Sequence, residues 1–204
     1  MNVSRAASIK LLAGLVCLLP LAWLVRGFVS DTLGANPFEV LTRATGEWAL
    51  RFLLLTLAMS PLRGILGLAW PLRYRRMLGL YAFFYAGVHL LTYLWFDQFF
   101  DWGEILRDIG KRPFITLGML AFVLLLPLAL TSSRAMMRRL GRHWKPLHRR
   151  IYPVGVLAVL HFLLLVKADW REPAVYGLIL ALLLGWRLLP DGIKRPRFRL
   201  LQRT

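Results

Sequence analysis

Apolar residues gather in six long segments separated by short charged ones, and this pattern predicts a bundle of membrane-spanning helices. A helix needs about 17–25 predominantly apolar residues to cross the hydrocarbon core of a bilayer. We expect such helices at residues 9–29, 48–68, 77–96, 113–130, 148–166 and 173–189. The fold predicted is all-α: a polytopic membrane protein whose six-transmembrane-helix bundle forms one domain over residues 1–204.

The charged residues predict how this bundle is oriented. The chain has 27 Lys and Arg against 10 Asp and Glu. With a cytoplasmic N-terminus, 19 basic residues fall on the cytoplasmic side and 8 on the opposite side. Because Lys and Arg concentrate in cytoplasmic loops, we predict an N-in/C-in topology. A nucleic-acid partner is excluded, since the basic residues lie between apolar spans and leave no soluble domain to form a groove.

Other features of the chain restrict the chemistry. Cys17 is the single cysteine and lies inside an apolar segment, which excludes a disulfide framework and a cysteine-based metal centre. The first segment follows Arg5 and Lys10 but has no small-residue cleavage site after it, so we expect a retained span rather than a signal peptide. No internal repeat is apparent.

Two of the four histidines are predicted to lie at the same depth in the membrane. His89 lies twelve residues, roughly 18 Å, beyond the start of helix 77–96. His161 lies thirteen residues, roughly 20 Å, beyond the start of helix 148–166, which runs in the same direction. An imidazole in hydrocarbon is costly and usually functional. Since imidazole is a common axial ligand, we predict that His89 and His161 bind one haem iron between them.

Small and aliphatic residues accompany these histidines at helical spacing. They recur at intervals of three and four residues as Gly79, Ala82, Ala86 and His89, and as Val154, Ala158, His161 and Leu165. Such stripes leave room for a macrocycle, and they also let helices pack closely. A hydrogen bond between helices and a proton relay are the alternatives. A relay would need carboxylates in the middle of the spans, and we expect none there.

The other two histidines precede helix 148–166 or begin it. His148 is predicted near the cytoplasmic end, as a ligand or a redox-site residue of an inner centre. At its depth, helix 77–96 offers Arg75 or Arg76, so a second bis-histidine site is incomplete. His143 is expected to be a surface residue. On the opposite side, the acidic and aromatic segment 97–112 is suited either to the membrane interface or to docking a partner protein.

Two stretches carry a resemblance to a known family. GLYAFFYAGVHLLTYL (79–94) and LGRHWKPLHRRIYPVGVLAVLHFLLLVKAD (140–169), together with the six-span plan, resemble the MsrQ (YedZ) family. This family supplies the haem-binding membrane subunit of the bacterial methionine sulfoxide reductase system and lies within the ferric-reductase-like transmembrane superfamily. The resemblance extends over essentially the whole chain.

The resemblance implies an electron-transfer subunit of the bacterial inner membrane that is not an enzyme on its own. Electrons would come from a cytosolic flavin reductase or from quinol and pass through b-type haem (one or two). They would reach a periplasmic, molybdopterin-containing MsrP-like subunit that repairs oxidised proteins. The family's haem-linked histidines carry over to His89, His148 and His161.

The resemblance also implies bound FMN. For its phosphate, or for haem propionates, the predicted inner loops offer Arg75, Arg76, Arg142 and Lys145. No glycine-rich phosphate loop is present to support a flavin site. Three alternatives to the electron-transfer subunit are a self-standing haem ferric reductase, a small transporter gated by histidine, and a structural membrane anchor. The transporter and the anchor both predict that the protein functions without haem.

Overall fold

The computed structural model describes residues 3–67, 69–166 and 169–190 of the chain. These residues form helices and turns, with no β-strand among them, which confirms the predicted all-α class. The basic tail beyond residue 190 lies outside the described residues. In chain order the helices are α1 (Val3–Val29), α2 (Pro37–Leu66), α3 (Pro71–Thr92), the π-helical turn η1 (Tyr93–Asp97), α4 (Trp102–Lys111), α5 (Pro113–Leu130), α6 (Arg134–Leu140), the 3-10 turn η2 (Gly141–His143), α7 (Trp144–His148), α8 (Ile151–Leu165) and α9 (Arg171–Leu188).

The start of α2 differs most from the prediction. The helix begins at Pro37, eleven residues before the expected residue 48. The Asn36 side chain caps it by accepting a hydrogen bond from the Glu39 N–H at 3.2 Å, and proline suits the first helical position because its missing N–H is not needed there. Glu47, which precedes the predicted helix 48–68, and Arg51, near its start, therefore lie well inside α2. By contrast, α5 has the predicted bounds 113–130.

The predicted helix 148–166 is broken in two. α7 ends at His148, α8 begins at Ile151, and the α6–α7 segment and α8 meet at an angle of 43°. Pro153 supplies the physical reason, because in a continuous helix its ring would clash with the carbonyl of Arg149 and it has no N–H to donate. His148 consequently lies at the end of a short helix, in front of the long one.

Four helical stretches are long and apolar enough to cross a membrane: Ala7–Val29, Pro37–Leu66, Pro71–Asp97 and Pro113–Leu130. The bent pair Arg134–His148 and Ile151–Leu165 gives a fifth. The remaining long helix, α9, carries Arg171, Glu172 and Arg187. The protein is thus a multi-pass helical membrane protein, while the six-span count and the N-in/C-in orientation stay predictions.

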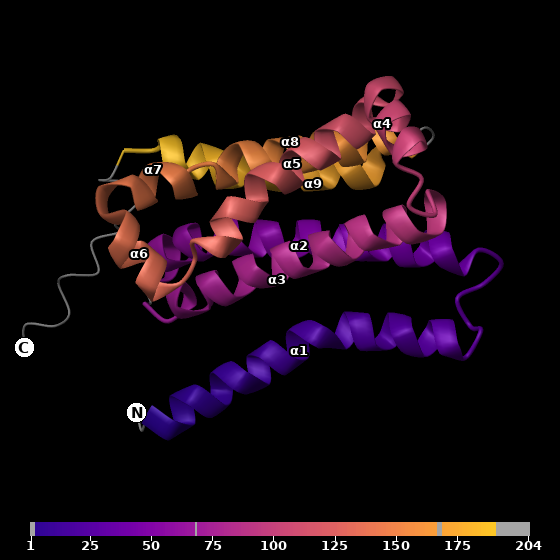
Figure 1. The fold of residues 1–204 in the computed structure, drawn as a ribbon. Coiled ribbons are helices and arrows are strands. Elements are labelled where there is room, and N and C mark those ends of the chain that lie inside the picture. The colour runs from indigo at the N-terminus through magenta and orange to yellow at the C-terminus, as the bar shows by residue number, and fades with distance from the viewer. Residues whose placement is uncertain (1–2, 68, 167–168, 191–204) are drawn as a thin grey trace, which may run out of the picture.

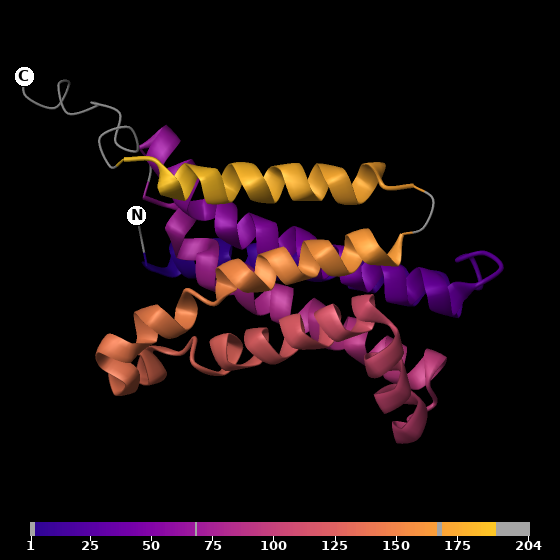
Figure 2. The ribbon, with the colours of Figure 1, turned by 90° about the horizontal axis from the view of Figure 1, so that it is seen from above.

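The helices form three layers (Figure 1). α2 and α3 pack side by side in the middle layer, α5, α8 and α9 cover one side of it, and α1 lies on the other. Figure 2 shows α9 running alongside α8. Leu57, Tyr85 and Val154 are fully buried between these layers. The two ends of the bundle are named here after the helices that lie at them, the α4 end and the α6 end (Figure 1).

α1 is attached to α3 by two tyrosine hydroxyls. Tyr81 donates to the Gly14 carbonyl at 2.8 Å, one turn away from Tyr85. The Tyr85 hydroxyl donates to the Cys17 carbonyl at 2.9 Å and accepts from the Leu21 N–H at 3.2 Å. In a regular helix those two backbone groups would bond to each other. The Tyr85 hydroxyl therefore replaces one backbone hydrogen bond of α1, next to Pro20.

α9 is fastened to the bundle by arginines near both of its ends. Arg187 donates to the Leu57 carbonyl at 2.8 Å and to the Tyr152 hydroxyl at 3.1 Å. The Leu57 carbonyl is open to this contact because the residue four positions later is Pro61, which has no N–H. Near the opposite end, Arg51 of α2 donates to the Tyr176 hydroxyl at 2.8 Å.

Candidate functional site

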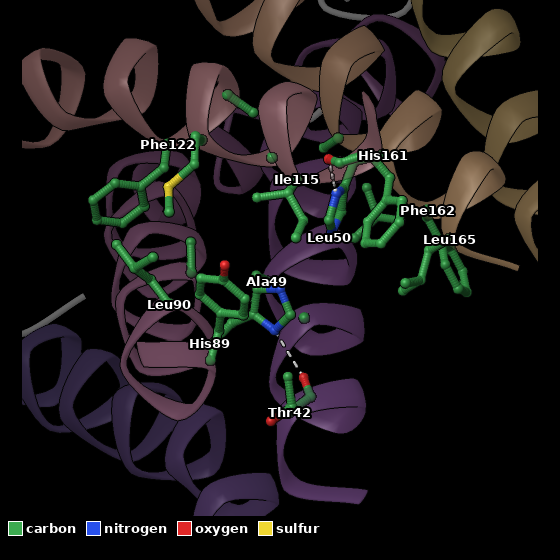
Figure 3. Close-up of a pocket in the computed structure, with 18 of the residues that line it drawn as sticks. Thr42, Ala49, Leu50, His89, Leu90, Ile115, Phe122, His161, Phe162 and Leu165 are labelled. Carbon is green, nitrogen blue, oxygen red and sulfur yellow. Dashed lines mark hydrogen bonds between the residues drawn. The ribbon is translucent and has the colours of Figure 1, made fainter. Parts of the chain in front are cut away.

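A cavity of about 650 Å³ lies between α2, α3, α5 and α8, and His89 and His161 point into it (Figure 3). The centroids of the two imidazole rings are 6.0 Å apart and the ring planes meet at 74°. Two imidazoles on opposite sides of one metal ion, each bound through a nitrogen about 2 Å away, place their centroids roughly 6 Å apart. The cavity is within the usual size range of cofactor sites. The structure thus brings together the two histidines that the sequence placed at one depth.

Each of the two rings is held by a backbone carbonyl. His89 Nδ1 lies 2.8 Å from the Thr42 carbonyl, and His161 Nδ1 lies 2.6 Å from the Phe114 carbonyl (Figure 3). A carbonyl can only accept, so both Nδ1 atoms carry the proton and both Nε2 atoms keep a lone pair. Such hydrogen bonds from the far nitrogen fix the tautomer and orientation of metal-binding histidines. Both rings are therefore prepared to bind a metal through Nε2.

Two glycines make room for these rings. A Cβ atom at Gly46 would lie 3.0 Å from Nδ1 of His89, and one at Gly118 would lie 2.9 Å from Nδ1 of His161. Contacts this short between carbon and a ring atom are rarely tolerated, so any larger residue at either position has to displace an imidazole. Neither glycine lies near a histidine along the chain, so no local sequence pattern points to either of them.

The two halves of this site repeat each other along the chain. Thr42, Gly46 and His89 correspond in order and spacing to Phe114, Gly118 and His161, and each carbonyl lies 47 residues before its histidine. α2 and α3 therefore supply one carbonyl, one glycine and one histidine, and α5 and α8 supply the same set. The site has an approximate two-fold symmetry between two helix pairs.

The rest of the cavity wall follows the same correspondence. Further lining residues pair at the constant offset that relates His89 to His161: 43/115, 47/119, 49/121, 50/122, 53/125, 86/158, 90/162 and 93/165. Our expectation of no internal repeat is therefore wrong. The repeat is hard to see in the sequence because few of these pairs have identical residues. Those that do are Gly46/Gly118, Ala49/Ala121, Leu53/Leu125, Ala86/Ala158 and His89/His161.

The predicted stripes of small residues line the cavity in part. Ala82, Ala86 and Ala158 do so, whereas Val154 is buried in the core and Gly79 faces Thr56. Beyond the histidines towards the α6 end, the lining residues are all apolar: Ala49, Leu50, Leu53, Ala82, Ala86, Ala121, Phe122, Leu125 and Ala158. At the α4 end the lining is polar, with Arg43, Asp97, Gln98 and Arg112. The cavity is thus apolar at one end and charged at the other.

A carboxylate lies beside the histidines, which the sequence analysis did not expect. Glu47 lines the cavity one residue after Gly46, and its carboxylate pairs with Arg51 at 2.8 Å. The prediction of no carboxylate within the spans depended on a helix beginning at residue 48, and α2 begins at Pro37. Because Glu47 is already neutralised by Arg51, this carboxylate adds no net charge to the wall.

His148 lies outside the cavity wall, and its ring makes different contacts from those of His89 and His161. Its ring stacks on Trp144 with centroids 4.0 Å apart, and Nε2 lies 3.0 Å from the Thr131 hydroxyl. That hydroxyl donates its one hydrogen to the Pro127 carbonyl at 2.6 Å, so His148 Nε2 must be the donor to Thr131. In the repeat, the counterpart of His148 is Arg76, which agrees with the predicted absence of a partner histidine.

The remaining predicted residues also lie away from the cavity. His143 is exposed and its Nε2 accepts from Arg142 Nε at 3.4 Å. Arg75, on α3, donates to the Ser60 hydroxyl of α2 at 3.4 Å. None of the four predicted inner cations, Arg75, Arg76, Arg142 and Lys145, belongs to the described lining of the cavity, whose cations are Arg43 and Arg112. A role for the inner four stays a prediction.

The fold and the site together define a multi-pass helical membrane protein with a cavity between two paired histidines. The family described as "Ferric reductase like transmembrane component" matches residues 45–159, from α2 into α8. The chain is 56% identical to the "Protein-methionine-sulfoxide reductase heme-binding subunit MsrQ" of Rhodospirillum rubrum over 182 residues, which cover 89% of this chain and 87% of that one. The protein of the same name from Azospira oryzae is 56% identical, over 91% and 80% of the two chains.

The protein of that name from Xanthomonas campestris pv. campestris is 60% identical over 159 residues, or 78% of this chain and 73% of that one. No solved structure matches the chain. These identities extend over most of both partners in each comparison. The chain belongs to the MsrQ family of haem-binding subunits, within the ferric-reductase-like transmembrane proteins.

Proposed function

We propose that this protein holds a b-type haem between His89 and His161 and conducts electrons through it across the membrane. The observation that carries the proposal is the pair of imidazoles 6.0 Å apart, each with Nδ1 bound to a backbone carbonyl and Nε2 directed to the cavity. Haem supplies one-electron chemistry at its iron. The relatives' printed names, which call them haem-binding subunits, support the assignment.

The protein's own residues suit electron transfer better than substrate chemistry. With its iron held by both His89 and His161, a haem would have no position left open for a substrate. The wall between the histidines and the α6 end is apolar, which disfavours water in that part of the cavity. The rings are fixed by carbonyls on rigid helices, so little rearrangement accompanies a change of charge. These features favour a conduit that is not an enzyme on its own.

For the membrane arrangement we propose six spans, with the N- and C-termini in the cytoplasm of a bacterial inner membrane. The α4 end then faces the periplasm and the α6 end the cytoplasm. The electron acceptor is an MsrP-like molybdopterin subunit at the periplasmic face, and the donor is a cytosolic flavin reductase or quinol. His148, stacked on Trp144 near the α6 end, is well placed to pass electrons towards the cavity, with FMN or a second haem as its cofactor.

The ligand geometry gives this proposal a spectroscopic signature. The imidazole planes of His89 and His161 meet at 74°, and a ferric haem held between near-perpendicular imidazoles would give a highly anisotropic low-spin signal in electron paramagnetic resonance. We expect the purified, oxidised protein to show this signal together with the sharp reduced bands of a six-coordinate b-type haem. A high-spin ferric signal as the main species would contradict bis-histidine binding.

The transport of electrons can be tested in phospholipid vesicles. With dithionite trapped inside and an MsrP-type subunit with an oxidised-methionine protein outside, we expect wild-type protein to support repair of the outer substrate. The His89→Ala variant should lower the rate at least tenfold, and the His143→Ala variant should leave it unchanged. Equal rates in all three proteins would reject the haem pathway and favour an anchor or a leak.

A further inference from the structure

We infer that the haem propionates point to the α4 end of the cavity, where Arg43 and Arg112 bind them. This inference rests on the proposed haem between His89 and His161 and adds the direction in which the macrocycle is inserted. It gives Arg43 and Arg112 the propionate-binding role that the sequence suggested for the inner cations Arg75, Arg76, Arg142 and Lys145.

The wall of the cavity is apolar at the α6 end and polar at the α4 end. A haem has an apolar macrocycle and two propionates at one edge, and a carboxylate in an apolar wall without a partner is strongly disfavoured. Beyond the histidines towards the α6 end, every described lining residue is apolar, ending at Leu53, Ala82 and Leu125. Arginine side chains line the cavity only at the α4 end. The propionate edge therefore has partners in one direction only.

The repeat of the site does not by itself select the direction in which a haem is inserted. It exchanges the two helix pairs and keeps the α4 end and the α6 end distinct, because α2 and α5 both run away from the α4 end and α3 and α8 both run towards it (Figure 1). The repeat therefore relates the two faces of a bound macrocycle, and the polar residues make these faces unequal, because the counterpart of Arg43 is Ile115 and the counterpart of Glu47 is Met119. The direction of insertion follows from the uneven polarity of the wall and the two arginines at the α4 end.

The charges of the two arginines are available to a ligand. Arg43 is exposed at the second turn of α2 and forms no ion pair with any residue that the structure describes. Arg112, just before α5, contacts Asp108 through Nε at 3.2 Å and keeps its two terminal nitrogens for a second carboxylate. Among the carboxylates of the wall, Glu47 is paired with Arg51 at 2.8 Å. Asp97 lies near Arg112, which a propionate would share with it.

The test compares haem with its dimethyl ester, in which both propionates have lost their charge. Binding of each to the haem-free protein is measured by Soret titration. Charge-assisted hydrogen bonds make haem bind roughly tenfold or more tightly than the ester in wild type. In the Arg43→Met/Arg112→Met double variant this ratio falls towards one. Arg142→Met, which removes an exposed cation at the α6 end, keeps the wild-type ratio.

The outcomes separate this inference from the proposed function. Equal affinity of wild type for haem and ester overturns the inference without the use of any variant, even if the double variant folds poorly. A ratio that survives in the double variant and falls in Arg142→Met also overturns it and places the propionates at the α6 end. Absence of bis-histidine haem from wild type, by contrast, rejects the proposed function itself.

Discussion

Replacing His89 or His161 by alanine is expected to remove the haem from this protein. In the proposed site each variant would lose one of the two residues that hold the haem iron, and the other imidazole cannot replace it because a carbonyl holds its ring. Changes in residues that only orient a metal ligand already lower metal affinity roughly 10- to 100-fold. We therefore expect the haem content after purification to fall by at least tenfold in each variant, measured by haem extraction and by the reduced-minus-oxidised spectrum.

The other two histidines provide matched controls for this loss. His143→Ala removes an exposed imidazole and should keep the full haem content. His148→Ala should keep the low-spin haem of the cavity, since His148 bonds to Thr131 and lies outside the lining. If His148→Ala lowers the content by about half and leaves the remaining spectrum unchanged, a second, inner haem is present. Unchanged haem in both His89→Ala and His161→Ala would contradict the site.

The second large effect is expected from adding one methyl group at a glycine. In Gly118→Ala the new Cβ would lie 2.9 Å from Nδ1 of His161, and in Gly46→Ala it would lie 3.0 Å from Nδ1 of His89. The helix that carries the glycine and the helix that carries the histidine are packed together and cannot move apart easily. The imidazole therefore has to turn or shift, and its hydrogen bond to the carbonyl is lost. We expect haem affinity to fall roughly tenfold in each variant, as for other losses of ligand orientation.

Gly87→Ala is the matched control for these two variants. Gly87 lies in α3 close to His89, but a Cβ at this position meets no atom within 4 Å. Alanine favours a helix over glycine by about 1 kcal/mol, so this variant should keep its haem and fold at least as well as wild type. Soret titration of the three haem-free variants gives the comparison. Wild-type affinity in Gly46→Ala and Gly118→Ala would show that the rings do not need their present positions.

The sequence predicted through simple helix lengths that His89 and His161 lie together. His89 and His161 lie at similar distances from the starts of two apolar segments, and helical rise is constant, so equal counts give equal depth. The two rings do lie side by side, although both predicted starts were inexact: α3 begins at Pro71 and α8 at Ile151. Their binding of a haem iron stays a prediction. Helix lengths could not supply the supporting residues, because Thr42, Phe114 and the two glycines come from α2 and α5, far from the histidines in sequence.

The cations predicted to bind a cofactor differ from those that line the cavity. Arg75, Arg76, Arg142 and Lys145 were chosen because they lie in dense basic loops, yet loop charge mainly reflects membrane topology. The cations that line the cavity, Arg43 and Arg112, belong to two separate segments in which acidic and basic residues are mixed. Which cation reaches a buried site depends on helix starts and side-chain direction, and the early start of α2 at Pro37 was not expected from the apolar pattern.

By itself, the sequence determined the helical class, the membrane setting and the two histidines, because bilayer thickness and helical rise convert residue counts directly into spans and depth. The tertiary structure alone decided which backbone carbonyls hold the rings, which glycines make room for them and which end of the cavity is charged. Those features come from contacts between residues that lie far apart along the chain, on different helices, and no local pattern of apolar and polar residues records them.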